Sequence, residues 1–182
     1  FEVLAKAKKL EAQGKEIIHL EIGEPDFETP DHIKEAAKKA LDDNYTHYVP
    51  SPGLMEVREV IAEHQSKVHN KNISPENVVF TPGAKPIMFF TIMALIEPGD
   101  EVIYPNPGFP IYESMINYVG GKAVPMELKE EKDFNADVDL VEESITDKTK
   151  LIILNSPNNP CGSVMEPSDI KRIADIAKQK DI

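Results

Sequence analysis

Cysteine and basic residues are scarce in this sequence of 182 residues. The single cysteine, Cys161, excludes an intrachain disulfide and fits a reducing compartment, so we expect a cytoplasmic protein. There are 20 lysines and arginines against 32 aspartates and glutamates, which gives a formal net charge of −12. Nucleic acids and anionic membranes are bound through excess positive charge, so we expect neither as a partner.

Long apolar runs are also missing. The longest, Pro86 to Ile96, is about half of what a membrane-spanning helix needs. No basic segment followed by a cleavable apolar one is present, so no secretory signal is visible. Because the sequence begins with Phe1 rather than methionine, we expect it to start inside a longer polypeptide.

Apolar residues make up 41% of the chain and charged residues 29%, which is typical of a soluble globular protein. Apolar residues at helical spacing alternate with short apolar runs typical of strands. This alternation predicts an α/β fold with a mostly parallel sheet. We expect helices over 1–13, 31–41, 54–68, 86–96, 112–118 and 138–145 and from Pro167 onward, and strands over 77–80, 101–104, 123–128 and 151–154.

The same patterns predict which segments are buried. In the helix over 31–41, an apolar stripe from Ile33 to Leu41 should face a core. The helix over 86–96 has few polar residues and should lie deep in its domain. The apolar run over 151–154 should be a strand buried on both faces. His19 alternates with apolar neighbours, which favours a partly buried strand residue over a catalytic base.

A polar loop, Asn155-Ser-Pro-Asn-Asn-Pro-Cys-Gly162, follows the last predicted strand. In open α/β sheets, ligands bind beyond the carboxyl ends of the strands, where this loop places three asparagine amides. Pro157 and Pro160 make the loop stiff. These residues indicate a small-molecule site, although an ordinary strand-to-helix turn explains the same composition equally well.

A second candidate is the turn Thr81-Pro-Gly-Ala-Lys85, which leads into the apolar helix. The unpaired N–H groups of a helix N-terminus attract phosphate, and Gly83 and Ala84 leave room for it to approach. Lys85 adds a possible positive charge. An ordinary strand-helix turn is the alternative. The motifs Gly-x-x-x-x-Gly-Lys-Ser/Thr and Gly-x-Gly-x-x-Gly are both absent from the sequence.

Two further positions allow a ligand-binding role and a simpler one. The loop Pro105-Asn-Pro-Gly-Phe-Pro110 contains three prolines and should hold Phe109 in one orientation, either against a planar ligand or in the core. Gly23 has no Cβ, so its backbone can approach a ligand closely, or it simply forms a turn.

Several motifs, in the same order along the chain, resemble those of the class I/II aminotransferases, enzymes of fold-type I that use pyridoxal 5'-phosphate (PLP). The Asn155–Gly162 loop is similar to their Asn-Asn-Pro-Thr-Gly loop, with Cys161 in place of the threonine. The other matching segments are Gly23-Glu-Pro-Asp-Phe27, Tyr48 with Gly53-Leu-Met-Glu-Val-Arg58, Thr81-Pro-Gly-Ala-Lys85, Pro98-Gly-Asp-Glu-Val102 and Asn106-Pro-Gly-Phe-Pro-Ile-Tyr112.

The resemblance implies a role for each candidate residue, with PLP as the cofactor. Asn159 would bind the phenolic oxygen of the cofactor, and Phe109 would stack on its pyridine ring. Gly23 would lie against the substrate α-carboxylate. The phosphate would be bound by Gly83, Ala84 and Lys85 and, from the partner subunit of a homodimer, by Tyr48. We predict no metal site.

The resemblance also implies a three-layer α/β/α large domain, of which residues 46–182 would form the first, incomplete part. Residues 1–45 would contribute to the small domain. The substrates would be an amino acid and a 2-oxo acid. The family's Schiff-base lysine and the acid that pairs with the pyridinium nitrogen match no position here. We therefore expect the lysine beyond Ile182, assign no catalytic residue, and expect the 182-residue chain alone to be inactive.

Three alternatives stay open on the sequence. PLP-dependent lyases and synthases share these motifs with the aminotransferases. A protein that kept the scaffold only for binding or dimerisation would also carry them. An unrelated doubly wound phosphate- or nucleotide-binding domain would need an acid that binds the ribose and would not bind PLP.

Overall fold

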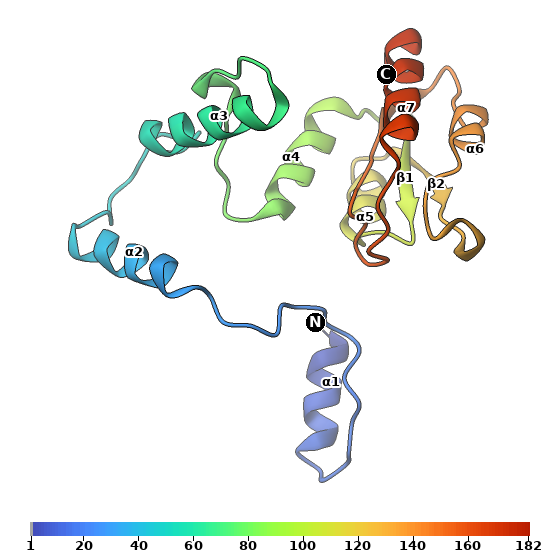
Figure 1. The fold of residues 1–182 in the computed structure, drawn as a ribbon. Helices are drawn as coiled ribbons and strands as arrows, with labels where there is room; N and C mark the ends of the chain where they lie inside the picture. The colour runs from blue at the N-terminus through green and yellow to red at the C-terminus, as the bar shows by residue number, and fades with distance from the viewer. Residues whose placement is uncertain (1) are drawn as a thin grey trace. The chain divides into compact units, whose positions relative to one another are not determined.

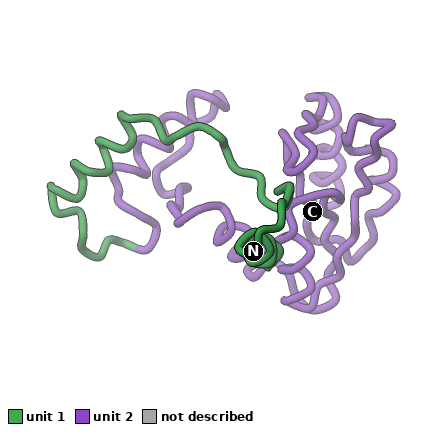
Figure 2. The backbone as a smooth tube through the Cα atoms, turned by 90° about the horizontal axis from the view of Figure 1, so that it is seen from below, with its two compact units in different colours: residues 1–50 green, residues 51–182 purple. Residues whose placement is uncertain are grey.

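The computed structural model describes residues 2–182, which divide into two compact units, residues 2–50 and residues 51–182 (Figure 2). The assignment of residues 1–45 to a small domain and of 46–182 to a large domain stays a prediction.

Unit 1 contains two helices, α1 (Glu2–Glu11) and α2 (Asp31–Asp42), joined by a segment without regular structure (Figure 1). The expectation of a partly buried strand around His19 is wrong. Its ring is exposed, and its two nitrogens lie 2.7 Å from carboxylate oxygens of Glu11 and Glu21. Hydrogen bonds to Glu11, which has the larger effect, and to Glu21 raise the pKa of His19.

Helix α2 begins after Pro30, as predicted, but its apolar stripe is not buried. Ile33 is 49% exposed and Leu41 is 65% exposed. The spacing correctly predicted the helix. The expected burial is absent, since α2 has no buried residue.

Unit 2 contains a parallel sheet with the strand order β2-β1-β3. Ile103 of β1 is in register with Val124 of β2 and with Ile152 of β3. The elements are α3 (Met55–His69), η1 (Pro75–Asn77), α4 (Ala84–Leu95), β1 (Glu101–Asn106), α5 (Ile111–Tyr118), β2 (Lys122–Glu127), η2 (Glu130–Lys132), α6 (Val138–Glu143), β3 (Thr149–Ile152) and α7 (Pro167–Lys180).

Successive residues of β1 face opposite layers of helices, as the two-residue period of a strand requires. Ile103 packs into a cluster with residues of α6 and α7, whereas Val102 and Tyr104 pack with residues of α4 and α5. The predicted three-layer α/β/α architecture is therefore confirmed. Strand β2 lies at an edge of this sheet, in agreement with the proline at position 125.

The predicted strand over 77–80 is not formed. Residues 75–77 form the short helix η1 instead, capped by Ser74, and the Phe80 N–H donates to the Pro52 carbonyl at 2.8 Å. A strand needs a neighbour for its backbone groups, and no described strand lies beside this segment. Val79 and Phe80 are accordingly more than half exposed.

One burial prediction in unit 2 is wrong, and another holds in part. Helix α4 forms as expected, but Ile92 is its only buried residue, and Phe90 is 58% exposed. The run over 151–154 packs on both faces, as predicted: Leu151 and Ile153 contact the cluster of α4 and α5, and Ile152 and Leu154 contact the cluster of α6 and α7. These residues are half-buried, and β3 lies at the other edge of the described sheet.

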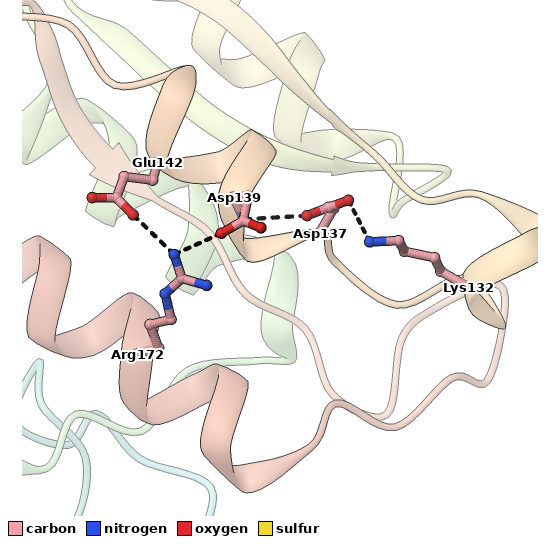
Figure 3. Close-up of polar contacts among 5 residues, drawn as sticks. All are labelled: Lys132, Asp137, Asp139, Glu142 and Arg172. Carbon is pink, nitrogen blue, oxygen red and sulfur yellow. Dashed lines mark hydrogen bonds and ion pairs between the residues drawn. The ribbon is translucent and has the colours of Figure 1, made fainter.

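Polar contacts join neighbouring elements of unit 2. The buried carboxylate of Glu101 accepts hydrogen bonds from Lys122 Nζ at 2.8 Å and Thr146 Oγ1 at 2.7 Å. Figure 3 shows Arg172 of α7 between Asp139 and Glu142 of α6, at 2.7 and 3.1 Å. The Arg172 contacts are exposed and contribute little to stability, whereas the buried Glu101 fixes β1 against β2 and the turn before β3.

Replacing Glu101 by glutamine should lower the free energy of unfolding of the full-length protein by about 1 kcal/mol at neutral pH, the usual size of a charge-assisted hydrogen bond with an exposed partner. Hydrogen bonds from Lys122, which has the larger effect, and from Thr146 lower the pKa of Glu101. A carboxyl group whose pKa is lowered by folding stabilises the folded state at pH values above its ordinary pKa. This contribution is lost as the pH falls through the pKa of the folded state. Urea unfolding should thus show the difference between Glu101→Gln and wild type shrinking below about pH 4.5. A pH-independent difference would contradict this role.

Candidate functional site

The turn before α4 has the backbone conformation of an anion-binding helix start. Gly83 precedes the helix with φ 93° and ψ 176°, and a Cβ built on it would meet no atom within 4 Å. Thr81 Oγ1 donates to the Gly83 carbonyl at 2.7 Å, which orients the turn. No side chain caps α4. The first N–H groups of the helix can therefore bind an anion, together with the positive end of its dipole.

The loop after β1 holds an aromatic ring beside this turn. Phe109 is half-buried and packs edge-to-face on Tyr112, with ring centroids 6.2 Å apart. Lys85 Nζ lies 5.8 Å from the centre of the Phe109 ring. Gly108 permits the tight path of the loop, because a Cβ there would lie 2.0 Å from the Pro105 carbonyl oxygen. The turn before α4 and the loop after β1 thus place a cation and an aromatic ring together.

The loop after β3 is built around a buried asparagine. Asn158 is 6% exposed, and its Oδ1 accepts the Cys161 N–H at 3.2 Å. Asn159, the next residue, is exposed, and its N–H donates to Asn155 Oδ1 at 3.1 Å when the Asn155 amide is oriented to satisfy both of its ends. Pro105 lines the same small cavity as Asn155 and Asn158. The loop after β3 therefore lies beside the C-terminal end of β1, from which the loop that carries Phe109 leaves the sheet.

The candidate residues from the sequence fall into two groups. The first group belongs to unit 2: Gly83 with the first two residues of α4, Ala84 and Lys85, and the loop residues Phe109 and Asn159. The structure brings Lys85 into contact with Phe109.

Gly23 and Tyr48 belong to unit 1, where both are exposed. Their roles in substrate and phosphate binding stay predictions.

Sequence reasoning missed the special position of Asn158. The sequence marked it only as one of three amides in the loop, whereas the structure buries it. The available signal was an asparagine three residues before Cys161, a spacing at which an asparagine side chain can hydrogen-bond a nearby backbone N–H in a turn.

The described residues, 2–182, contain neither a cluster of metal-ligating side chains nor a membrane-spanning helix. No three histidine, cysteine, aspartate or glutamate side chains in that range come together as metal ligands would. No helix in that range is long and apolar enough to cross a membrane.

The chain belongs to the family described as aminotransferase class I and II, whose sequence profile matches residues 15–182. It is 43% identical over 180 residues to a probable aspartate/prephenate aminotransferase of Aquifex aeolicus, covering 99% of this chain and 46% of that protein. It is 47% identical over 165 residues to a probable aspartate aminotransferase of Methanocaldococcus jannaschii, covering 91% and 44%.

Solved structures agree with this assignment. The fold is similar to that of an aspartate aminotransferase from Thermus thermophilus with maleate, with a TM-score of 0.94, 39% identity and coverage of 100% of this chain and 47% of that one. An alanine aminotransferase from Pyrococcus furiosus gives a TM-score of 0.93 at 35% identity, covering 100% and 47%. The chain spans about half the length of the relatives it matches.

Gly83→Ala should lower the free energy of unfolding of the full-length protein by about 1–3 kcal/mol, because its backbone angles lie in a region that is essentially restricted to glycine. The added methyl group would meet open space, so backbone strain alone accounts for the loss. Gly23→Ala is the matched control, since Gly23 has equally open surroundings without a positive φ. It should change stability by less than about 0.5 kcal/mol in denaturant unfolding. Equal losses in both variants would refute the strained conformation.

Proposed function

We propose that the full-length protein containing this chain is a PLP-dependent aminotransferase that transfers an amino group between an amino acid and a 2-oxo acid. The observation that carries the proposal is the family membership of residues 15–182. It is joined by the arrangement of unit 2, where Lys85 at the start of α4 lies over the ring of Phe109 and the loop after β3 lies beside the end of β1. Relatives whose names specify aspartate or prephenate make a dicarboxylic amino acid the first substrate to test.

The chemistry of the three loops fits PLP, which combines a phosphate, a flat cationic ring and a phenolic oxygen. The open space at Gly83 and the uncapped start of α4 suit the phosphate, with Lys85 nearby as a counter-charge. The half-buried ring of Phe109 offers an aromatic face for the pyridine ring. Asn159 carries an exposed amide that can donate a hydrogen bond to the phenolic oxygen.

When bound, PLP would supply the electron sink that stabilises a carbanion at the substrate Cα. The residues of this chain bind and orient. The start of α4 at Ala84 and Lys85 fixes one end of the site, where Gly83, whose N–H donates to the Thr81 carbonyl at 2.8 Å, leaves room for the phosphate. Phe109 sets the plane of the ring, and Asn159 holds the opposite edge. We assign no proton transfer to these residues, and we propose that the lysine for that step lies outside this chain, which alone is inactive.

Two residues of unit 1 would complete the site. Gly23, whose surroundings are open to a ligand, would receive the substrate α-carboxylate. Tyr48 is fully exposed, and we propose that it reaches the phosphate of the cofactor in the partner subunit of a cytoplasmic homodimer. An exposed aromatic ring with a hydroxyl is typical of residues that become covered at an interface.

The reaction is tested with the purified full-length protein, reconstituted with PLP and supplied with aspartate and 2-oxoglutarate. The protein should form glutamate and oxaloacetate in equal amounts, and the 182-residue chain should form neither. Other amino acids, aromatic ones first, should be tried as donors if aspartate is not used. Release of ammonia or carbon dioxide without amino transfer to any 2-oxo acid would refute the proposal and indicate a lyase.

Replacing Asn159 by alanine should weaken PLP affinity of the full-length protein about 10- to 100-fold, the range for losing a hydrogen bond to a charged acceptor. The affinity is measured by titrating the cofactor-free protein and following the visible absorption of bound PLP. Asn72→Ala is the control, because Asn72 is an exposed asparagine on the loop after α3. Unchanged affinity in Asn159→Ala would exclude a contact with the phenolic oxygen.

A further inference from the structure

Asn158 is an amide buried where an apolar side chain would pack at lower cost. It is 6% exposed and lines a small cavity with apolar residues that include Met126, Phe134 and Leu154. Its Oδ1 accepts one hydrogen bond, from the Cys161 N–H, while its Nδ2 has no partner. Burying an unpaired amide N–H costs free energy. The side chain therefore needs an explanation other than packing.

The backbone of Asn158 closes the loop on itself. Its N–H donates to the Ser163 carbonyl at 2.8 Å, and its carbonyl accepts the Gly162 N–H at 2.7 Å. Gly162 has φ 74°, which allows the chain to reverse at this point. With the side-chain bond to Cys161, three hydrogen bonds of one residue hold the turn over 158–163.

The turn is fastened to the core on both sides. Ser156 Oγ accepts the N–H of Met165, a buried core residue, at 3.0 Å. Ser163 Oγ donates to the Phe134 carbonyl at 2.8 Å. Asn159 lies inside this fastened turn, yet its own side chain is exposed. Its backbone position is thus set by the residue before it and by the Asn155 amide.

We infer that Asn158 is a positioning residue for Asn159: its side-chain bond to the Cys161 N–H holds the turn that aims the Asn159 amide at the cofactor. The inference rests on the proposed PLP site. Burying the Asn158 amide lowers stability, but it holds a ligand-binding group in place before the ligand arrives, as the supporting residues of a binding site do.

The test compares Asn158→Ser and Asn158→Ala in the full-length protein. Serine and alanine remove similar volume, but a serine hydroxyl can still accept a nearby backbone N–H. Alanine should weaken PLP affinity about tenfold, and serine by less than about threefold, because serine restores the acceptor. In the cofactor-free protein, hydrogen exchange at the Cys161 amide should speed up in the alanine variant more than in the serine variant.

A double-mutant cycle with Asn159→Ala separates positioning from general stability. If Asn158 acts through Asn159, Asn158→Ala should change PLP affinity by less than about twofold in the Asn159→Ala background. Equal effects of serine and alanine, or additive effects of positions 158 and 159, would overturn the inference while leaving the PLP site intact. Failure of the wild-type protein to bind PLP would instead overturn the proposed function. If the alanine variant does not fold, Asn158→Ser replaces it in the double-mutant cycle and separates positioning of Asn159 from general stability.

Discussion

The parallel pairing of β1 with a strand on each side is the constraint on which the rest of unit 2 depends. Val102 and Ile103 of β1 are completely buried, one against each helical layer. Burial of a large aliphatic side chain contributes about 1.5–3 kcal/mol, so these positions tolerate little change. Because the three strands run in the same direction, the loops after β1 and β3 both leave the sheet at the carboxyl ends of its strands. In open α/β sheets, ligands bind beyond these carboxyl ends.

In each loop after these strands, a residue available to a ligand is supported by a buried neighbour. Phe109 rests on Tyr112, which is 4% exposed, and Asn159 follows the buried Asn158. Burial raises the pKa of Tyr112, which favours its neutral hydroxyl form. A site assembled in this way needs little reorganisation when a ligand arrives, which is the physical advantage of placing binding groups on a rigid scaffold.

The sequence was sufficient for features determined by neighbouring residues and insufficient for those determined by distant ones. The start of α7 at Pro167 follows from local backbone chemistry and was predicted correctly. The proline at position 125 likewise fits the edge position of β2. Residues 77–80 read as a strand from their apolar run, but a strand forms only beside a partner. The burial of the apolar residues of α2 and α4 was predicted wrongly for the same reason. Apolar spacing shows which face of a helix can be buried, but it does not show which segment covers that face.

The most direct measurement is a crystal structure of the full-length protein with PLP. The account predicts the phosphate at the start of α4, beside Gly83 and against the backbone of Ala84 and Lys85. It predicts the pyridine ring on Phe109 and the Asn159 amide within hydrogen-bonding distance of the phenolic oxygen. Electron density for PLP at another place in the molecule, or with Asn159 turned away from it, would contradict the central claim that these three loops form the cofactor site.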